Sequence, residues 1–349
     1  MIVDESSNRM QAVRAKSFGT PDVLVLEEVP VPRPGPGQML IKVESAAVNF
    51  SDVKRRRNDT YPFPTTLPYI PGGEVAGTVE TLGDGVEGPQ VGTPVFALVG
   101  ADGSTGCAQY ALANASGVIP IPPGLGADVA SGLVIAGSTA VLVLKEAARL
   151  QAGESVLVQG AAGGVGSYAV QVAKLLGAGT VIGAAGSPGK REAVLALGAD
   201  YAVDYTEMDW PGRVLELTDG RGVDVVLEMA GGASFEQGLS CLAPFGRVVV
   251  YGSSSGEPLQ MGPEKIQALF YDPSPNQSLV AFNLGLWFTM RPEAAVGALQ
   301  TLIGYVASGQ VEVPIGHVLP LSQAAEAHRM IEERRTTGKI VLKPWATGR

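Results

Sequence analysis

The sequence predicts an α/β protein that combines an antiparallel, barrel-like β domain with a doubly wound domain built on a parallel sheet. The chain has 349 residues, of which 46% are hydrophobic and 17% charged, so it can bury two domain cores. As far as about residue 124, short strand-like segments alternate with Pro- and Gly-rich turns. Beyond that point strands and helices alternate strictly, which is typical of a parallel sheet with right-handed crossovers.

The first part of the chain is expected to be all-β. Prolines at positions 30, 32, 34 and 36 exclude a helix or a central strand there. The expected strands, all short and rich in Val, Leu or Ile, cover residues 23–26, 39–43, 75–79, 95–99 and 118–121.

The second part begins with an Ala- and Val-rich helical stretch over residues 128–148, which is broken at Gly137. Strands are expected over residues 155–159, 181–185, 201–203, 223–229 and 247–251, with 277–282 as a candidate final strand. Helices are expected over residues 165–176, 190–197, 235–242, 292–308 and 322–335, and a last strand over residues 339–343.

Composition excludes several classes of partner. The net charge of −9 argues against nucleic acid or an anionic membrane surface. The longest apolar stretch, residues 132–144, is shorter than the ~20 residues of a membrane-spanning helix. The four Cys and His residues do not have metal-ligand spacing, and two distant cysteines form no disulfide framework. Together with an N-terminus unlike a signal peptide, this predicts a cytoplasmic protein without a metal site.

A glycine-dense turn between the strand at 155–159 and the next helix is the most informative motif. It contains the fingerprint Ala161-x-Gly163-x-x-Gly166, with Ala where the first Gly usually stands. Small residues let the backbone approach a pyrophosphate at the N-terminus of the helix. We therefore predict dinucleotide binding, in preference to a merely structural turn, through Ala162, Gly163, Gly164, Val165 and Gly166.

The end of the second strand of this series indicates which dinucleotide is bound. NAD-binding folds usually place an acidic residue there to hold the ribose 2′-hydroxyl. This chain has Ser187, Lys190 and Arg191, and no acid before Glu192. A hydroxyl and two cations favour a 2′-phosphate, and therefore NADPH, over the alternative of an ordinary solvated helix start.

The sequence resembles the zinc-free quinone oxidoreductase branch of the medium-chain dehydrogenase/reductase superfamily, which includes zeta-crystallin. The resemblance covers residues 10–344. The motifs that carry it are 160–167 (GAAGGVGS), 46–52 (AAVNFSD), 71–79 (PGGEVAGTV), 136–140 (AGSTA), 198–205 (GADYAVDY) and 337–342 (TGKIVL). It implies a GroES-like catalytic domain over residues 1–134 and 284–349, a Rossmann NADP-binding domain over 135–283, and a homodimer.

The resemblance also implies roles for individual residues. Asn49 and Asp52 are expected beside the nicotinamide and the substrate, and Asn49 also contacts the cofactor. Many relatives carry a Tyr soon after this element, and Tyr61 is the catalytic candidate here. The remaining cofactor-binding candidates are Thr139 near the nicotinamide ribose, Ser187, Lys190 and Tyr205 around the 2′-phosphate and adenine ribose, and Gly252, Ser253 and Lys339 where relatives close over the cofactor.

The zinc-dependent relatives have a Cys ligand in place of Asn49 and a His ligand in place of Gly73, so no metal is expected. Directly after the Asn-x-x-Asp element, where many relatives carry the Tyr, this chain has the basic run 54–57. That run is either a solvated helix face or a site for an acidic substrate. Trp287 and Phe288 are either walls of an aromatic pocket or core residues. Glu74 is expected to be structural, with a bond to nearby backbone.

These observations predict an NADPH-dependent, zinc-independent oxidoreductase that passes a hydride to a small-molecule quinone or α,β-unsaturated carbonyl. Two alternatives stay open. One is a pathway-specific enoyl reductase. The other is a non-enzymatic NADPH-binding protein with a structural or sensing role.

Overall fold

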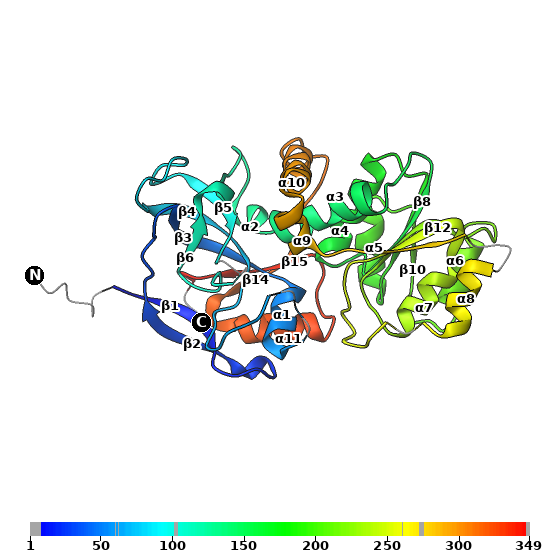
Figure 1. The fold of residues 1–349 in the computed structure, drawn as a ribbon, viewed down its shortest axis with the longest axis horizontal. Coiled ribbons are helices and arrows are strands. Elements are labelled where there is room, and N and C mark those ends of the chain that lie inside the picture. The colour runs from blue at the N-terminus through cyan, green and yellow to red at the C-terminus, as the bar shows by residue number, and fades with distance from the viewer. Residues whose placement is uncertain are drawn as a thin grey trace, which may run out of the picture. The chain divides into compact units, whose positions relative to one another are not determined.

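The computed structural model describes residues 8–346, apart from residues 60, 62, 101–103, 260 and 272–275. The chain divides into two compact units (Figure 1). The first unit contains the residues up to Ile135 together with those from Val313 onward, and the second unit runs from Ala136 to Glu312.

The first unit is built on a seven-stranded sheet and a two-stranded ribbon. The ribbon pairs β1 (Arg9–Ala15) with β2 (Leu24–Pro30) in antiparallel fashion. The sheet is antiparallel except at its β14–β15 pair. Its strands, in order, are β14 (Ile315–Pro320), β15 (Lys339–Lys343), β3 (Gln38–Val48), β4 (Glu74–Leu82), β5 (Pro94–Leu98) and β7 (Ile119–Pro120), with β6 (Tyr110–Asn114) also paired to β3.

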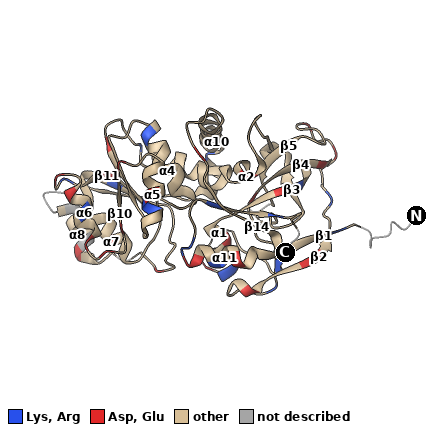
Figure 2. Ribbon diagram, turned by 180° about the vertical axis from the view of Figure 1, so that it is seen from behind, with Lys and Arg blue, Asp and Glu red and all other residues tan. Residues whose placement is uncertain are grey.

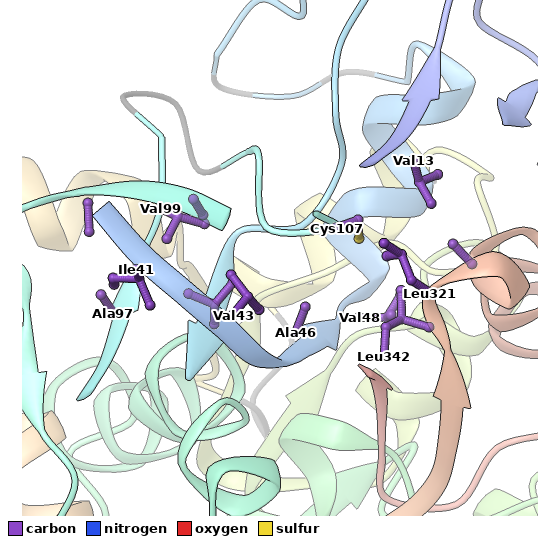
Figure 3. Packing of buried hydrophobic residues seen from close by; sticks show 14 of the residues in the cluster. Val13, Ile41, Val43, Ala46, Val48, Ala97, Val99, Cys107, Leu321 and Leu342 are labelled. Carbon is purple, nitrogen blue, oxygen red and sulfur yellow. The ribbon is translucent and has the colours of Figure 1, made fainter. Parts of the chain in front are cut away.

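The core of the first unit is made of small and β-branched side chains (Figure 3). Val43 and Ala46 of β3 are completely buried, as is Leu342 of β15. Because β15 pairs with β3, Ile340 opposite Val48, the last strand of the chain completes a core begun near its start. The α-helices among the described residues of this unit are α1 (Phe50–Arg57), α2 (Ala127–Ala130) and α11 (Ala324–Glu332).

The second unit is a six-stranded, wholly parallel sheet with the order β10-β9-β8-β11-β12-β13. This order is the one produced by two consecutive mononucleotide-binding halves, so the doubly wound prediction is confirmed. The strands are β8 (Ser155–Gln159), β9 (Thr180–Ala184), β10 (Tyr201–Val203), β11 (Val223–Glu228), β12 (Leu242–Val250) and β13 (Ser278–Ala281). The helices that connect them are α4 (Gly164–Leu175), α5 (Pro188–Ala196), α6 (Trp210–Glu216), α7 (Ala233–Ser240) and α8 (Pro263–Tyr271).

Three further helices belong to the second unit: α3 (Ser138–Leu142), α9 (Leu284–Met290) and α10 (Pro292–Ala307). Leu302 of α10 lies over Gly137, where a Cβ would stand 2.1 Å from Leu302 Cδ2. This close approach explains why a glycine stands there. The expected break in the helix at Gly137 is wrong, because Gly137 has helical backbone angles, φ −70° and ψ −47°, and a π-helical turn over Leu133–Gly137 runs directly into α3. Residues 284–312 belong to the second unit, whereas the resemblance implies that they belong to the catalytic domain.

Several elements were not predicted from the sequence. They include β1, the five-residue β6, the half-exposed β14, and α1, α6 and α9. Within the described residues, no helix is both long enough and apolar enough to cross a membrane.

Candidate functional site

Asn49 and Asp52 are held together at the start of α1. Strand β3 ends at Val48, and Asn49 precedes the first helical residue with an extended backbone, φ −122°. The Asp52 carboxylate, in the first turn, accepts the backbone N–H of Asn49 at 2.8 Å and that of Gly72 at 3.2 Å. A carboxylate three residues into a helix satisfies N-terminal N–H groups that have no intrahelical acceptor, which explains the Asn-x-x-Asp spacing.

The Asn49 side chain belongs to a cluster that also contains Glu74 and Lys339, which we call the amide cluster. Asn49 Nδ2 donates to Glu74 Oε1 at 3.0 Å, and Lys339 Nζ donates to Asn49 Oδ1 at 2.6 Å. The same ammonium lies 3.1 Å from Glu74 Oε1. Glu74 Oε2 accepts the backbone N–H of Ile135 at 2.7 Å. The expected bond between Glu74 and backbone is therefore present, alongside two side-chain contacts that the sequence analysis did not anticipate.

The amide cluster is shielded from water. The exposed fractions are 8% for Asn49, 0% for Glu74 and 2% for Lys339. Buried ions must be paired to persist, and here an ammonium and a carboxylate are in direct contact. Neighbouring Asp52 is only 3% exposed, and this burial raises the pKa of its carboxyl to about 6, against the opposing effect of the two N–H bonds.

Two of the four basic residues in the run on α1 are buried, while Arg57 is exposed. Arg55 and Arg56 are 2% and 0% exposed, so the interpretation as a solvated face is wrong for both. Arg56 donates to Gly19 O at 2.7 Å and pairs with Glu332 of α11, a helix on which acidic and basic residues alternate (Figure 2). These guanidinium groups tie α1 to its neighbours, which gives them a structural use.

Tyr61, the third catalytic candidate, is half-buried beside the same helix. The Arg55 guanidinium carbon lies 5.3 Å from its ring centre, within the range of a cation–π contact. Its ring also meets Phe63 edge to face, with the centroids 6.2 Å apart.

The phosphate loop of the second unit is shaped by its glycines. Gly160, at φ +60°, turns the chain after β8, and Gly163 leads into α4. A Cβ on Gly166 would stand 2.3 Å from Gly160 O, so only glycine allows this closure. The first-turn N–H groups of α4 have no acceptor within the helix, and no acidic residue lies in that turn. The loop therefore suits an anion.

Ala161 departs from the usual fingerprint, and a second glycine makes room for it. Ala161 is completely buried beside Gly183 of β9. A Cβ on Gly183 would lie 2.9 Å from the Ala161 Cβ. The methyl group thus occupies space that Gly183 leaves open.

The end of β9 carries the candidates for the 2′-phosphate. Gly186 lies under Tyr205, because a Cβ there would be 2.9 Å from the Tyr205 hydroxyl oxygen. Ser187 immediately precedes α5, and Lys190 lies in its first turn and is half-buried. Arg191 forms an ion pair with Asp204, which immediately precedes Tyr205. This cation is therefore committed to a carboxylate.

The other cofactor candidates of the second unit lie on α3 and after β12. Thr139, on α3, is 6% exposed. Gly252 lies just after β12, and a Cβ on it would be 3.2 Å from Met229 O. The Ser253 hydroxyl donates to Glu257 O at 3.1 Å. The backbone N–H groups of Ser254 and Ser255 donate to Met229 O and Ala230 O, both at 2.8 Å, and these bonds hold the segment after β12 against the segment after β11.

Sequence reasoning missed Glu228, the last residue of β11. It is completely buried, and its Oε1 accepts the N–H groups of Ala230 at 2.6 Å and Gly231 at 2.7 Å. Burial raises the pKa of this carboxyl. An acid that ends a buried strand and is followed by Gly231-Gly232 was the available clue. Among the described residues, no three His, Cys, Asp or Glu side chains are grouped to hold a metal ion.

Comparison with known proteins identifies the class that this fold and these sites define. The family described as "Alcohol dehydrogenase GroES-like domain" matches residues 35–123, and "Zinc-binding dehydrogenase" matches residues 164–271. The chain is 34% identical to quinone oxidoreductase of Rattus norvegicus, over 95% of this chain and 97% of that protein. It is also 34% identical to 2-haloacrylate reductase of a Burkholderia species, over 97% and 99% of the two chains.

Solved structures of quinone oxidoreductases are similar to this chain over almost its whole length. Escherichia coli quinone oxidoreductase complexed with NADPH has a TM-score of 0.87 at 29% identity, covering 96% of this chain and all of that one. A mycobacterial protein complexed with NADPH gives 0.87 at 33% identity, with the same coverage. The chain belongs to the quinone oxidoreductase branch of the medium-chain dehydrogenase/reductase superfamily, a family of oxidoreductases, as the sequence predicted.

One relative is much longer than this chain, so the match covers only a small part of it. The chain is 35% identical to part of a much longer protein, a phenolphthiocerol/phthiocerol polyketide synthase of Mycobacterium tuberculosis. That match covers 97% of this chain, but this chain spans only 15% of the synthase.

Proposed function

We propose that this protein is an NADPH-dependent oxidoreductase that transfers a hydride to a quinone or an α,β-unsaturated carbonyl without a metal. The observation that carries the proposal is the Asn49 amide. Its Nδ2 has two hydrogens, one of which is donated to Glu74. The other has no acceptor among the described residues, and it is available to a substrate oxygen.

The chemistry follows from that donor. When bound, NADPH supplies the hydride from C4 of its nicotinamide. As a hydride adds to carbon of the acceptor, negative charge builds on the conjugated oxygen. Asn49 would donate its second Nδ2 hydrogen to that oxygen, in surroundings that exclude water and strengthen the bond. The proton that completes the reduction comes from solvent.

The second unit fits NADPH in three respects. The N-terminus of α4 offers N–H groups for the pyrophosphate, through the predicted residues Ala162 to Gly166. Ser187 and Lys190 would hold the 2′-phosphate, the latter through a charge-assisted bond. Tyr205 would lie against the adenosine ribose, with Gly186 beneath it. Thr139, Gly252, Ser253, Asp52 and Tyr61 stay candidates for contacts with cofactor or substrate.

Two similarities favour a second candidate, an enoyl reductase of a biosynthetic pathway. One is the match to a polyketide synthase, and the other is the match to 2-haloacrylate reductase, whose named substrate is a conjugated acid. The non-enzymatic alternative keeps the NADPH site but has no acceptor.

We also propose a cytoplasmic homodimer. Strand β13 ends the six-stranded sheet, and among the described residues no further strand pairs with it. Leu279 on this edge strand is 49% exposed. An apolar edge of this kind is covered when it pairs with the same strand of a second copy. Both cysteines are free, as expected in a reducing compartment.

The test is an NADPH-oxidation screen with four acceptors: 1,4-benzoquinone, 9,10-phenanthrenequinone, methyl vinyl ketone and 2-chloroacrylate. Turnover of the quinones above all others supports the first candidate. Preference for the conjugated carbonyls supports the second. Tight NADPH binding without turnover of any acceptor would favour the non-enzymatic role.

A further inference from the structure

We propose that Lys339 and Glu74 are positioning residues that fix the orientation of the Asn49 side-chain amide, so that its Nδ2 and not its Oδ1 is presented to the substrate oxygen. The inference rests on the proposed function and deepens it. It gives Lys339 a role different from the cofactor contact that the family resemblance implies.

The three side chains of the amide cluster differ in what they can do in a hydrogen bond. An ammonium only donates and a carboxylate only accepts, whereas an amide has one end of each kind. Lys339 Nζ is 2.6 Å from Asn49 Oδ1, and Glu74 Oε1 is 3.0 Å from Asn49 Nδ2. Rotating the amide by half a turn would place its NH₂ against the ammonium and its oxygen against the carboxylate. Both contacts would then be repulsive.

Burial makes this preference strong. An exposed amide can turn and exchange its partners for water, but Asn49 is 8% exposed and both partners are 2% exposed or less. Charges act more strongly on neighbouring dipoles where water is excluded. The pair therefore holds the amide in the one orientation that leaves the second Nδ2 hydrogen for the substrate oxygen.

The fold supplies this arrangement from three adjacent strands. β15 pairs with β3, with Ile340 opposite Val48, and β3 pairs with β4, with Ala47 opposite Glu74. Lys339, on β15, thus reaches Asn49 from one side of β3, and Glu74, on β4, reaches it from the other side. The bond from Ile135 N to Glu74 Oε2 holds the carboxylate in place.

The consequence is a specific kinetic signature. A residue that acts by orienting Asn49 affects stabilisation of the substrate oxygen, and therefore kcat. A residue that contacts the cofactor affects the Kd of NADPH. The experiment compares Lys339→Met with the control Lys343→Met, which removes an ammonium that lies on the same strand and pairs with Asp128.

For Lys339→Met we expect kcat, with whichever of the four acceptors reacts fastest, to fall about 10–100-fold, the range for loss of a hydrogen bond to a charged group. The Kd of NADPH, measured by fluorescence titration, should change by less than about twofold. Lys343→Met should leave both values unchanged. If Lys339→Met does not fold, Glu74→Gln combined with Lys339→Met replaces it, because that pair leaves no buried charge without a partner.

Combination with Asn49→Ala separates positioning from a general structural role. If Lys339 acts through Asn49, then Lys339→Met should lower kcat by less than about twofold in the Asn49→Ala background. An equal loss in both backgrounds, or weaker NADPH binding with an intact kcat, would overturn the inference while leaving the proposed function standing. An unchanged kcat in Asn49→Ala alone contradicts the proposed function, and the inference with it.

Discussion

The two units build their candidate sites from different materials. In the first unit, side chains from distant parts of the chain meet in the amide cluster, where Lys339 and Asn49 are 290 residues apart. In the second unit, the predicted phosphate loop is made by consecutive residues, and the groups that would face a ligand are backbone N–H groups. One site depends on paired charges in a dry interior, and the other on the absence of side chains.

This difference has a physical consequence for substitution. Removal of a side chain from the amide cluster leaves a buried polar partner unsatisfied, which is costly. The phosphate loop has no such side chains to lose, and it is sensitive instead to added atoms, as the 2.3 Å approach at Gly166 indicates. Lys190 and Arg191, near the proposed 2′-phosphate site, are half-exposed, so we expect substitutions there to cost less than in the buried amide cluster.

The largest effect is expected at the centre of the amide cluster. Asn49→Ala should lower kcat by about 10²–10³-fold, the usual cost of losing one donor to a developing oxyanion. The Kd of NADPH, measured by fluorescence titration, should hardly change, since the residues proposed to hold its phosphates lie in the second unit. Steady-state kinetics with the best acceptor decide the matter. An unaltered kcat would remove Asn49 from the mechanism.

The same contrast explains what the sequence could predict. Local sequence patterns predict the phosphate loop, the parallel sheet and the candidates Ser187 and Lys190. Strands, turns and helix starts can be recognised from patterns within about 30 consecutive residues. No local pattern predicts the pairing of Lys339 with Glu74, since it depends on which strands become neighbours. The burial of Arg55 and Arg56 was missed for the same reason. Four consecutive cations suggest a solvated face until Glu332 and Tyr69 are placed beside them.

The position of residues 284–312 illustrates a related limit. The sequence marks α10 as a helix but not the surface on which it packs. Gly137 and Leu302 are far apart in the chain, and their contact shows that α10 belongs with α3.

The next effect concerns the charge of Asp52. Its pKa rises from 3.8 in the ordinary carboxyl to about 6 in the folded protein, so the folded state holds the proton more tightly. The stabilisation that results is complete only well below pH 4 and is lost as the pH rises through about 6, a total change of about 3 kcal/mol. Relative to the wild type, Asp52→Asn should therefore gain about 2.4 kcal/mol of stability between pH 4 and pH 7.

Urea denaturation at pH 4, 5, 6 and 7 measures this difference, with the exposed Asp84→Asn as the control. The absolute stability of Asp52→Asn is not the test, because the amide also loses one of the two accepted N–H bonds. A stability difference that does not change with pH contradicts a raised pKa at Asp52.

A smaller effect is expected at the 2′-phosphate candidates of the second unit. Lys190→Ala should weaken NADPH binding by about 10–100-fold, which corresponds to loss of one charge-assisted bond worth about 1.5–3 kcal/mol. NADH lacks the 2′-phosphate, so its Kd should stay the same. Arg191 is not expected to compensate, since it is paired with Asp204.

Fluorescence titration of both cofactors, with Lys145→Ala as a surface control, provides the comparison. Equal losses for NADPH and NADH would show that Lys190 supports the fold of α5 and does not hold the phosphate. Tighter binding of NADH than NADPH in the wild type would overturn the cofactor assignment itself.

The smallest effect, none at all, is expected from removal of metal ions. The zinc-dependent relatives have Cys and His ligands at the positions of Asn49 and Gly73, and neither of these residues supplies a thiolate or an imidazole. Between Asn49 Oδ1 and Glu74 Oε1 the chain places the Lys339 ammonium, at 2.6 and 3.1 Å. That charge occupies the oxygens that a cation would need, and it repels a second positive ion. Dialysis against EDTA should therefore leave kcat unchanged, and elemental analysis should find no stoichiometric zinc. Activity that is lost on chelation and restored by zinc would show that the amide cluster does not replace the metal.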